Sequence, residues 1–193
     1  NDDSLSEYLR IISDKVGQLD HFITDVLSHS KNLKQDVKVE AIDFSMIIKR
    51  TFQDLGYMRG ADQIKRNISI QGCQFFSDPW RIGEIFRNLI SNAIKYRKLN
   101  NVSCEVSIQI AIDDQQASIQ FKDNGIGIGS ENMNKIFEMF YRASEQSEGS
   151  GLGLYIVKNA IEKLKGQLSV TSLPEEGTTF EIILPNNKMD TIR

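Results

Sequence analysis

Long apolar runs, clustered cysteines and an excess of one charge are all missing from this chain of 193 residues. The apolar runs are only a few residues long, so we expect no segment that spans a bilayer. Cys73 and Cys104 have no close-spaced Cys or His partner, which predicts buried, reduced thiols and no disulfide or metal site. A net charge of −3 provides no general basic surface, so nucleic acid is not an expected partner.

The length suits one packed domain with an appendage, and a hydrophobic fraction of 40% is ordinary for a globular protein. The chain starts at Asn1 without a signal peptide, and its helical pattern begins almost at once. We therefore expect a cytoplasmic fragment of a longer protein, whose parent could be anchored in a membrane.

Apolar residues at heptad spacing dominate the first thirty positions. They are Leu5, Leu9, Ile12, Val16, Leu19, Ile23 and Val26. This spacing predicts a helix over Leu5–Ser30 that packs lengthwise on other helices. Ile11, Phe22 and Leu27 widen the stripe, which favours a helix bundle over a two-stranded zipper. The alternative is a long helix docked on the globular part. Polar Ser28–Lys38 is expected to form an exit or linker.

Helical and strand patterns alternate from Val37 onward. Helices are expected from Asp43, as N-cap, to Leu55, from Asp78-Pro79 to Arg97, and after Gly153. Strands are expected near residues 37–41, 67–71, 74–76, 104–112, 117–121, 168–173 and 178–184. The predicted class is α+β: a two-layer α/β sandwich with a mixed, mostly antiparallel sheet covered on one face by helices, preceded by one long bundle-type helix.

A glycine-rich loop, Gly149-Ser150-Gly151-Leu152-Gly153-Leu154, leads into an amphipathic helix. Helix N-termini expose unpaired N–H groups, and glycines let a phosphate come close to them. No Lys-Ser/Thr follows the loop, and Ile156 stands where a dinucleotide fingerprint needs its third glycine. Phosphate binding and a plain chain reversal both remain open from this loop alone.

Asn88, Asn92, Lys95 and Tyr96 form one row along the border of the apolar stripe of the helix after Pro79. An Asn amide oxygen can coordinate Mg²⁺, and Lys offers a point charge to phosphate. An ordinary solvated helix flank is the alternative.

Asp123 ends a predicted strand and is followed by Gly125, Gly127 and Gly129. A carboxylate at that place could accept a hydrogen bond from an exocyclic amine such as that of adenine, while glycine backbone lies close to a flat ligand. A simple Asp-Asn-Gly turn is the competing interpretation.

Taken together, these blocks resemble the catalytic domain of sensor histidine kinases of two-component systems, within the superfamily that includes type II topoisomerases, MutL-like proteins and a heat-shock chaperone. The segments from Asn88 to Tyr96, from Asp123 to Gly127, from Phe137 to Arg142 and from Gly149 to Leu154 resemble its N box, first glycine box, F box and second glycine box. Gly177-Thr178-Thr-Phe180 is similar to the last short box.

The resemblance implies ATP and Mg²⁺ as ligands. It implies that Asn92 coordinates Mg²⁺, with Asn88 in the same cleft, that Lys95 reaches the phosphates and that Tyr96 borders the nucleotide. Asp123 would select adenine beside Gly125 and Gly127, and Thr178 would contact the base. Residues 149–154 would give N–H groups to the phosphates, with Gly151 and Gly153 as hinges of a lid over residues 142–150. Arg142 would be a phosphate contact.

By the same resemblance, residues 1–36 form the second helix of a dimerisation and phosphotransfer hairpin, and residues 37–193 the ATP-binding domain. The activity implied is transfer of the ATP γ-phosphate to a histidine, for relay to the receiver domain of a response regulator, in a homodimeric parent. The helix that carries the acceptor is missing here. Neither His21 nor His29 has the family's acidic and proline neighbours, so autophosphorylation is not expected.

Two other functions use the same pocket. A related ATPase or switch would need a glutamate to activate water, but Asn88 occupies that position. A scaffold unable to bind nucleotide would have no need of Asn92, Asp123 and the second glycine box.

Overall fold

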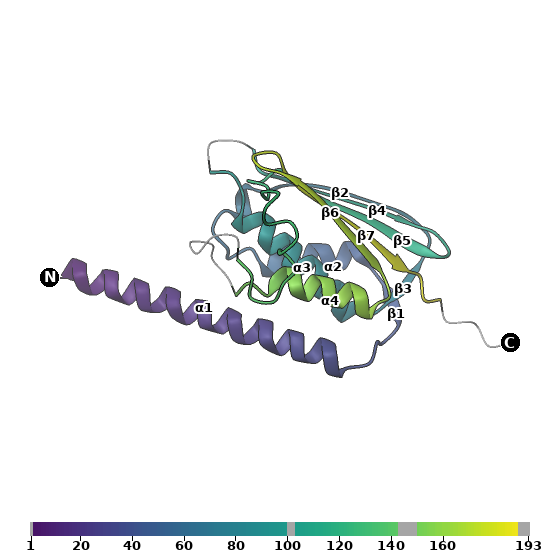
Figure 1. Ribbon diagram of the computed structural model, residues 1–193, viewed down its shortest axis with the longest axis horizontal. Coiled ribbons are helices and arrows are strands. Elements are labelled where there is room, and N and C mark those ends of the chain that lie inside the picture. The colour runs from purple at the N-terminus through teal and green to yellow at the C-terminus, as the bar shows by residue number, and fades with distance from the viewer. Residues whose placement is uncertain (1, 100–102, 143–149, 189–193) are drawn as a thin grey trace.

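The computed structural model describes residues 2–99, 103–142 and 150–188. In the N-terminal helix up to residue 21, it describes only some of the side chains. Figure 1 shows a sheet, a layer of helices on one of its faces, and a long helix that lies against the helical layer and projects beyond it. No helix within the described ranges is long and apolar enough to cross a membrane.

The main sheet has five strands in the order β2-β4-β5-β7-β6. They are β2 (Lys65–Gly72), β4 (Glu105–Ile112), β5 (Gln116–Asp123), β6 (Gln167–Leu173) and β7 (Gly177–Pro185). Only β2 and β4 pair in parallel, so the predicted mixed, mostly antiparallel sheet is confirmed. A second, two-stranded sheet pairs β1 (Glu40–Ile42) with β3 (Phe75–Ser77).

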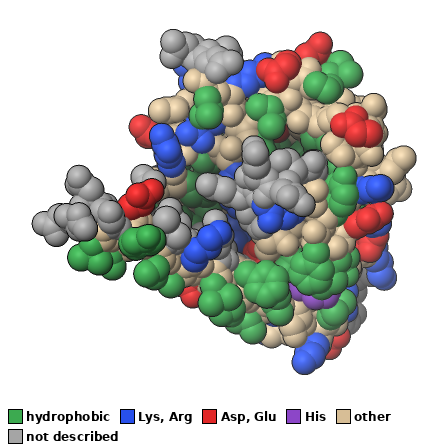
Figure 2. Space-filling model, turned by 60° about the vertical axis from the view of Figure 1, so that its left-hand side comes forward, with side chains coloured by type: hydrophobic (Ala, Val, Ile, Leu, Met, Phe, Trp, Pro, Cys, Tyr) green, Lys and Arg blue, Asp and Glu red, His purple; other side chains and the backbone are tan. Residues whose placement is uncertain are grey.

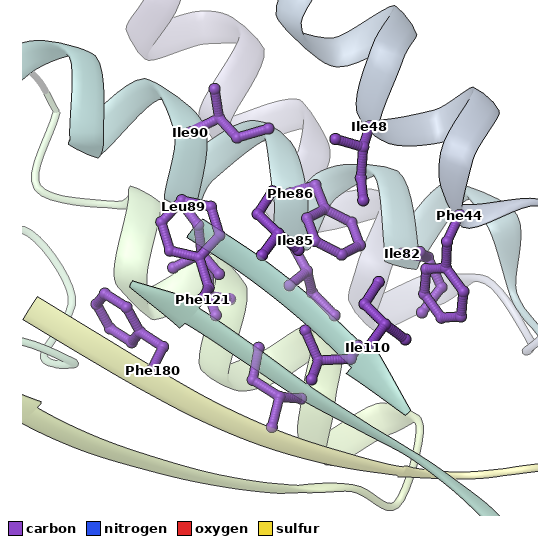
Figure 3. Packing of buried hydrophobic residues seen from close by; sticks show 14 of the residues in the cluster. Phe44, Ile48, Ile82, Ile85, Phe86, Leu89, Ile90, Ile110, Phe121 and Phe180 are labelled. Atoms are coloured by element: carbon purple, nitrogen blue, oxygen red, sulfur yellow. The ribbon is translucent and has the colours of Figure 1, made fainter. Parts of the chain in front are cut away.

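Helices α2 (Phe44–Asp54), α3 (Pro79–Lys95) and α4 (Gly153–Lys163) cover one face of the sheet, as predicted. Asp43 and Asp78 accept hydrogen bonds from the N–H groups of Met46 and Arg81, so both predicted N-caps are confirmed. A short 3₁₀ helix spans Ala61–Gln63. Figure 3 shows the core between the layers, where Ile85, Phe86 and Leu89 of α3 lie over Phe121 and Phe180 of the sheet.

The N-terminal helix α1 (Asp2–Lys34) has two different environments. Its heptad stripe is exposed along its length, from 57% at Leu5 to 38% at Val26. Its last turns, however, lie against the helical layer next to α4. In Figure 2 hydrophobic side chains follow the projecting helix and continue along the neighbouring surface of the globular part. α1 thus combines the two features that the sequence left as alternatives: its last turns are docked on the globular part, and its heptad stripe is exposed.

Several predicted boundaries were wrong. α1 continues through the predicted linker to Lys34, and the first strand starts at Glu40, three residues later than expected. α3 ends at Lys95, where Tyr96 becomes its C-cap. Both cysteines are free, but Cys73 is exposed because it follows Gly72 beyond the end of edge strand β2; only Cys104 is buried.

Candidate nucleotide-binding site

The polar row predicted on α3 forms one wall of the candidate site. Asn88 is buried and its amide nitrogen donates to the carbonyl of Glu84 at 2.8 Å, which leaves its amide oxygen to face outward from the helix. Asn92 is half-buried one turn later, whereas Lys95 and Tyr96 are exposed. The gradient of burial places neutral oxygen atoms deep and the cation at the rim, which suits a ligand with a half-buried anionic group.

The first residue of α4 closes against this row. A Cβ atom built on Gly153 would lie 3.0 Å from Asn88 Oδ1 and 3.9 Å from Asn92 Oδ1. The second glycine box therefore meets the N box at a position where a side chain would crowd the amide oxygens. The N–H groups at the start of α4 and two amide oxygens of α3 line the same place, which combines an anion-binding helix terminus with ligands for a hard cation.

Asp123 lies at the end of β5, opposite Thr178 of β7. Its Oδ1 accepts a hydrogen bond from the N–H of Gly125 at 2.9 Å. Burial raises the pKa of the Asp123 carboxyl above its usual value, while the backbone N–H groups of Gly125 and Thr178 act in the opposite direction. A partly buried carboxylate with remaining acceptor capacity suits a ligand that brings an N–H donor.

The first glycine box lies close to the backbone of two other segments, at Tyr96 and at Leu173. A Cβ on Gly125 would lie 2.6 Å from the carbonyl oxygen of Tyr96, and one on Gly127, where φ is +70°, would lie 2.0 Å from that of Leu173. The N–H of Ile126 also donates to Tyr96 O at 3.0 Å. Through these contacts the end of α3 and the Asp123 turn form one continuous edge, joined through the backbone of Tyr96.

The second glycine box is described from Ser150 onward. Gly151 has φ +72° and packs on Phe140, with which a Cβ would collide at 2.6 Å, so the second glycine box contacts the F box. Leu152 is fully buried and Leu154 partly so. Arg142 is exposed at the last described position before the gap. The predicted site residue Gly149 and the predicted lid residues 143–149 lie outside the described residues.

Two contributors were missed from the sequence. Ser172 of β6 faces Thr178 across the hairpin, with their hydroxyl oxygens 3.0 Å apart, and accepts from the N–H of Ile128 at 2.9 Å. The register of the predicted hairpin would have revealed it. Asp25 of α1 accepts a hydrogen bond from the Ser150 hydroxyl at 2.5 Å, and no local signal in the sequence indicates that pairing.

No group of three or more His, Cys, Asp or Glu residues among the described part of the chain is placed to hold a metal ion. The amide oxygens beside Gly153 nevertheless fit a cation that brings its own anionic ligands, because Mg²⁺ is commonly held by few protein groups plus phosphates and water.

Comparison with known proteins identifies the family of the chain. The family described as histidine kinase-, DNA gyrase B- and HSP90-like ATPases matches residues 77–188, which hold the N box, both glycine boxes and Thr178. The chain belongs to this family of ATP-binding domains.

Within the family, the relatives are sensor kinases. The autoinducer 2 sensor kinase/phosphatase LuxQ of Vibrio vulnificus is 32% identical over 178 residues, which cover 86% of this chain and 21% of LuxQ. The chain thus spans about a fifth of that relative. The resemblance to sensor histidine kinases is confirmed.

Solved structures show the same fold. The mycobacterial sensor histidine kinase MprB has a TM-score of 0.65 at 28% identity, over 79% of this chain and 100% of that one. Full-length ShkA in complex with AMPPNP has a TM-score of 0.71 at 22% identity, over 94% of this chain and 38% of that one.

Proposed function

We propose that this chain binds Mg·ATP and transfers its γ-phosphate to a histidine on a helix that packs against the apolar stripe of α1. The observation that carries the proposal is the meeting of Asn88 and Asn92 with Gly153 at the start of α4, on the same edge as Asp123. Residues 1–36 would belong to the dimerisation and phosphotransfer part and residues 37–193 to the ATP-binding domain.

Each group in the site has a distinct task in this proposal. The Asp123 carboxylate accepts from the adenine amine, Thr178 and the glycine backbone lie beside the base, and Tyr96 borders it. Lys95, Arg142 and the N–H groups of residues 149–154 hold the phosphates. Asn92, with Asn88 beside it, would hold Mg²⁺, which neutralises phosphate charge when bound. Catalysis then rests on positioning and charge neutralisation, as is general for phosphoryl transfer.

The parent protein would work as a homodimer through α1, because the stripe from Leu5 to Val26 is too extensive to remain solvated. The phosphoryl group would pass on to an aspartate of a response regulator. Use of ATP would place this domain in the cytoplasm.

Calorimetry with ATP and Mg²⁺ tests the pocket. Asn92→Ala removes the amide oxygen that would hold Mg²⁺, and Asp123→Ala removes the acceptor for adenine, so each should weaken binding by about tenfold or more, the effect of losing a charge-assisted contact. Asn67→Ala, on the exposed surface of β2, is the matched control and should bind like wild type. Equal affinities for all four proteins would refute the proposed site.

Base selection and pH give a second test of Asp123. Wild type should prefer ATP to GTP, since guanine presents a carbonyl oxygen where adenine presents an amine. Affinity for ATP should fall as the pH drops through the raised pKa of Asp123, because protonation removes the anionic acceptor. Asp123→Asn should lose both the preference and this pH dependence. A wild type that binds GTP equally well would contradict the role of Asp123.

A turnover assay without acceptor separates a kinase from the related ATPases. With Asn88 in place of a water-activating carboxylate, hydrolysis should be slow, and phosphate should instead appear on an added histidine-bearing helix. Rapid acceptor-independent hydrolysis would favour the ATPase.

A further inference from the structure

Arg81, near the start of α3, is the largest fully buried side chain of the described core, with 1% of its surface exposed. All five of its side-chain N–H donors have acceptors. Nε donates to Asn32 Oδ1 at 2.8 Å, Nη2 to the carbonyls of Asn32 at 3.2 Å and Gln35 at 2.6 Å, and Nη1 to the carbonyl of Asp36 at 3.4 Å and to Asp78 Oδ2 at 2.5 Å. A guanidinium this completely satisfied defines one arrangement of its neighbours.

These acceptors come from two different elements. The carbonyl of Asn32 is among the last four of α1, which have no partner inside the helix, and those of Gln35 and Asp36 follow its end. Asp78 is the N-cap of α3, and its Oδ2 also accepts from the N–H of Lys38. Arg81 therefore joins the C-terminal end of α1 directly to the N-terminal end of α3.

Helix α3 also carries the polar row of the candidate site. Asn88, Asn92 and Lys95 follow Arg81 on α3, within one uninterrupted helix. A second contact lies two turns back along α1, where Asp25 is 3.6 Å from Arg87. An α-helix transmits position along its length because each turn is hydrogen-bonded to the next. The direction of α1 is consequently set relative to the phosphate side of the site.

We propose that Arg81 is a positioning residue for phosphoryl transfer: it fixes the direction in which α1 leaves the ATP-binding domain, and with it the path by which an acceptor helix packed on α1 reaches the nucleotide. The proposal rests on the proposed kinase function. It gives Arg81 no contact with ATP, so its removal should disturb transfer and leave nucleotide binding in place.

Distance measurements between spin labels test the anchor without nucleotide. Labels at Asp20→Cys of α1 and Gln109→Cys of β4, both exposed, are introduced after Cys73→Ser and Cys104→Ala. Wild-type Arg81 should give one narrow distance distribution. Asn32→Ala removes one Arg81 acceptor but leaves the Asp78 ion pair, so the domain should fold while the narrow peak broadens.

Two further variants complete the test. Asn32→Asp restores an acceptor for Arg81 and should restore the narrow peak, whereas Arg81→Lys keeps the charge beside Asp78, loses the planar fork and should broaden it. Arg50→Met, at an exposed pair with Asp54, is the control and should change nothing. A broad wild-type distribution, or an equally narrow one in both Asn32→Ala and Arg81→Lys, would overturn the proposal.

The functional test compares the affinity for Mg·ATP with the rate of phosphoryl transfer in the same variant. Asn32→Ala should bind Mg·ATP with the wild-type affinity but phosphorylate an added acceptor helix about tenfold or more slowly, since small misplacements of reacting groups cost that much or more. Unchanged transfer would overturn the role of Arg81. A wild type with a narrow distance distribution that binds no ATP would instead refute the kinase function and leave the anchor supported.

Discussion

α1 and α3 are both amphipathic helices with a long apolar stripe, yet they use that stripe in different ways. In α3, Ile85 and Leu89 are 1% exposed and pack on the sheet, whereas in α1, Leu9 and Ile12 are 58% exposed. Periodicity shows that a helix face is suited to burial, but not which surface covers it. The stripe of α3 finds its partner within the described chain, and that of α1 does not.

The last turns of α1 sharpen this difference. Four contacts hold these turns on the rest of the protein: Phe22 with Phe140, Asp25 with Ser150, His29 with Tyr155, and Asn32 with Arg81. Their spacing of 3, 4 and 3 residues defines a second face, displaced by one position from the heptad stripe. This docking face, defined by those four residues, is largely polar or aromatic, so α1 can hold the ATP-binding domain while its apolar stripe stays available.

The largest effect on stability is expected from Ile85→Ala, for which Ile12→Ala is the matched comparison. Ile85→Ala should lower the free energy of unfolding by about 2–5 kcal/mol, because it leaves a cavity in the core. At a protein concentration low enough to keep the chain monomeric, Ile12→Ala should change it by less than about 0.5 kcal/mol, since its side chain is exposed within one chain. Urea denaturation measures both. A large loss for Ile12→Ala that depends on protein concentration would show that a second copy covers the stripe.

A middle-sized effect is expected at the docking face. Asp25→Ala removes the acceptor of the Ser150 hydroxyl and a neighbour of Arg87, and should cost about 1 to 2 kcal/mol, less than full loss of a buried pair because Arg87 keeps Glu84. Asp20→Ala, exposed on the same helix, is the control in the same urea experiment. Equal stability of the two variants would mean that α1 does not dock through Asp25.

The smallest effect compares two helical glycines. An added Cβ meets nothing within 4 Å at either Gly17 of α1 or Gly83 of α3. Gly83→Ala should raise the free energy of unfolding by about 0.5–1 kcal/mol through helix propensity. Gly17→Ala should raise helical circular dichroism with little change in the cooperative transition, since that part of α1 projects from the fold. An equal gain in unfolding free energy would contradict this difference.

Much of the candidate site was predictable because its signals are local. The row from Asn88 to Lys95 follows from helical geometry alone, and Asp123 from its place at the end of an alternating strand. The caps Asp43 and Asp78 are equally local. The nucleotide-binding role of these residues remains a prediction, which the calorimetry above tests.

Other features could not be predicted from the neighbouring sequence. Asp25 is 125 positions away from its partner Ser150. Arg81 caps α1 from 49 residues away, and no local signal in the sequence indicates that contact. The observed end of α1 differs from the predicted one for the same reason. Arg81 satisfies carbonyl groups at and just beyond the end of α1, so the helix continues through a polar stretch. Ser172 differs from these features, because the register of the predicted hairpin was enough to place it opposite Thr178.

By itself, the order of residues determined which helix faces are apolar, where the capped helices α2 and α3 begin, and which polar side chains and glycines make up the candidate site, since each depends on spacing within a turn or a strand. Tertiary structure alone decided that Gly153 closes on Asn88 and that Arg81 holds the end of α1. Those contacts join segments whose separation along the chain carries no periodic signal, and only the packing of α4 and α1 against α3 brings them together.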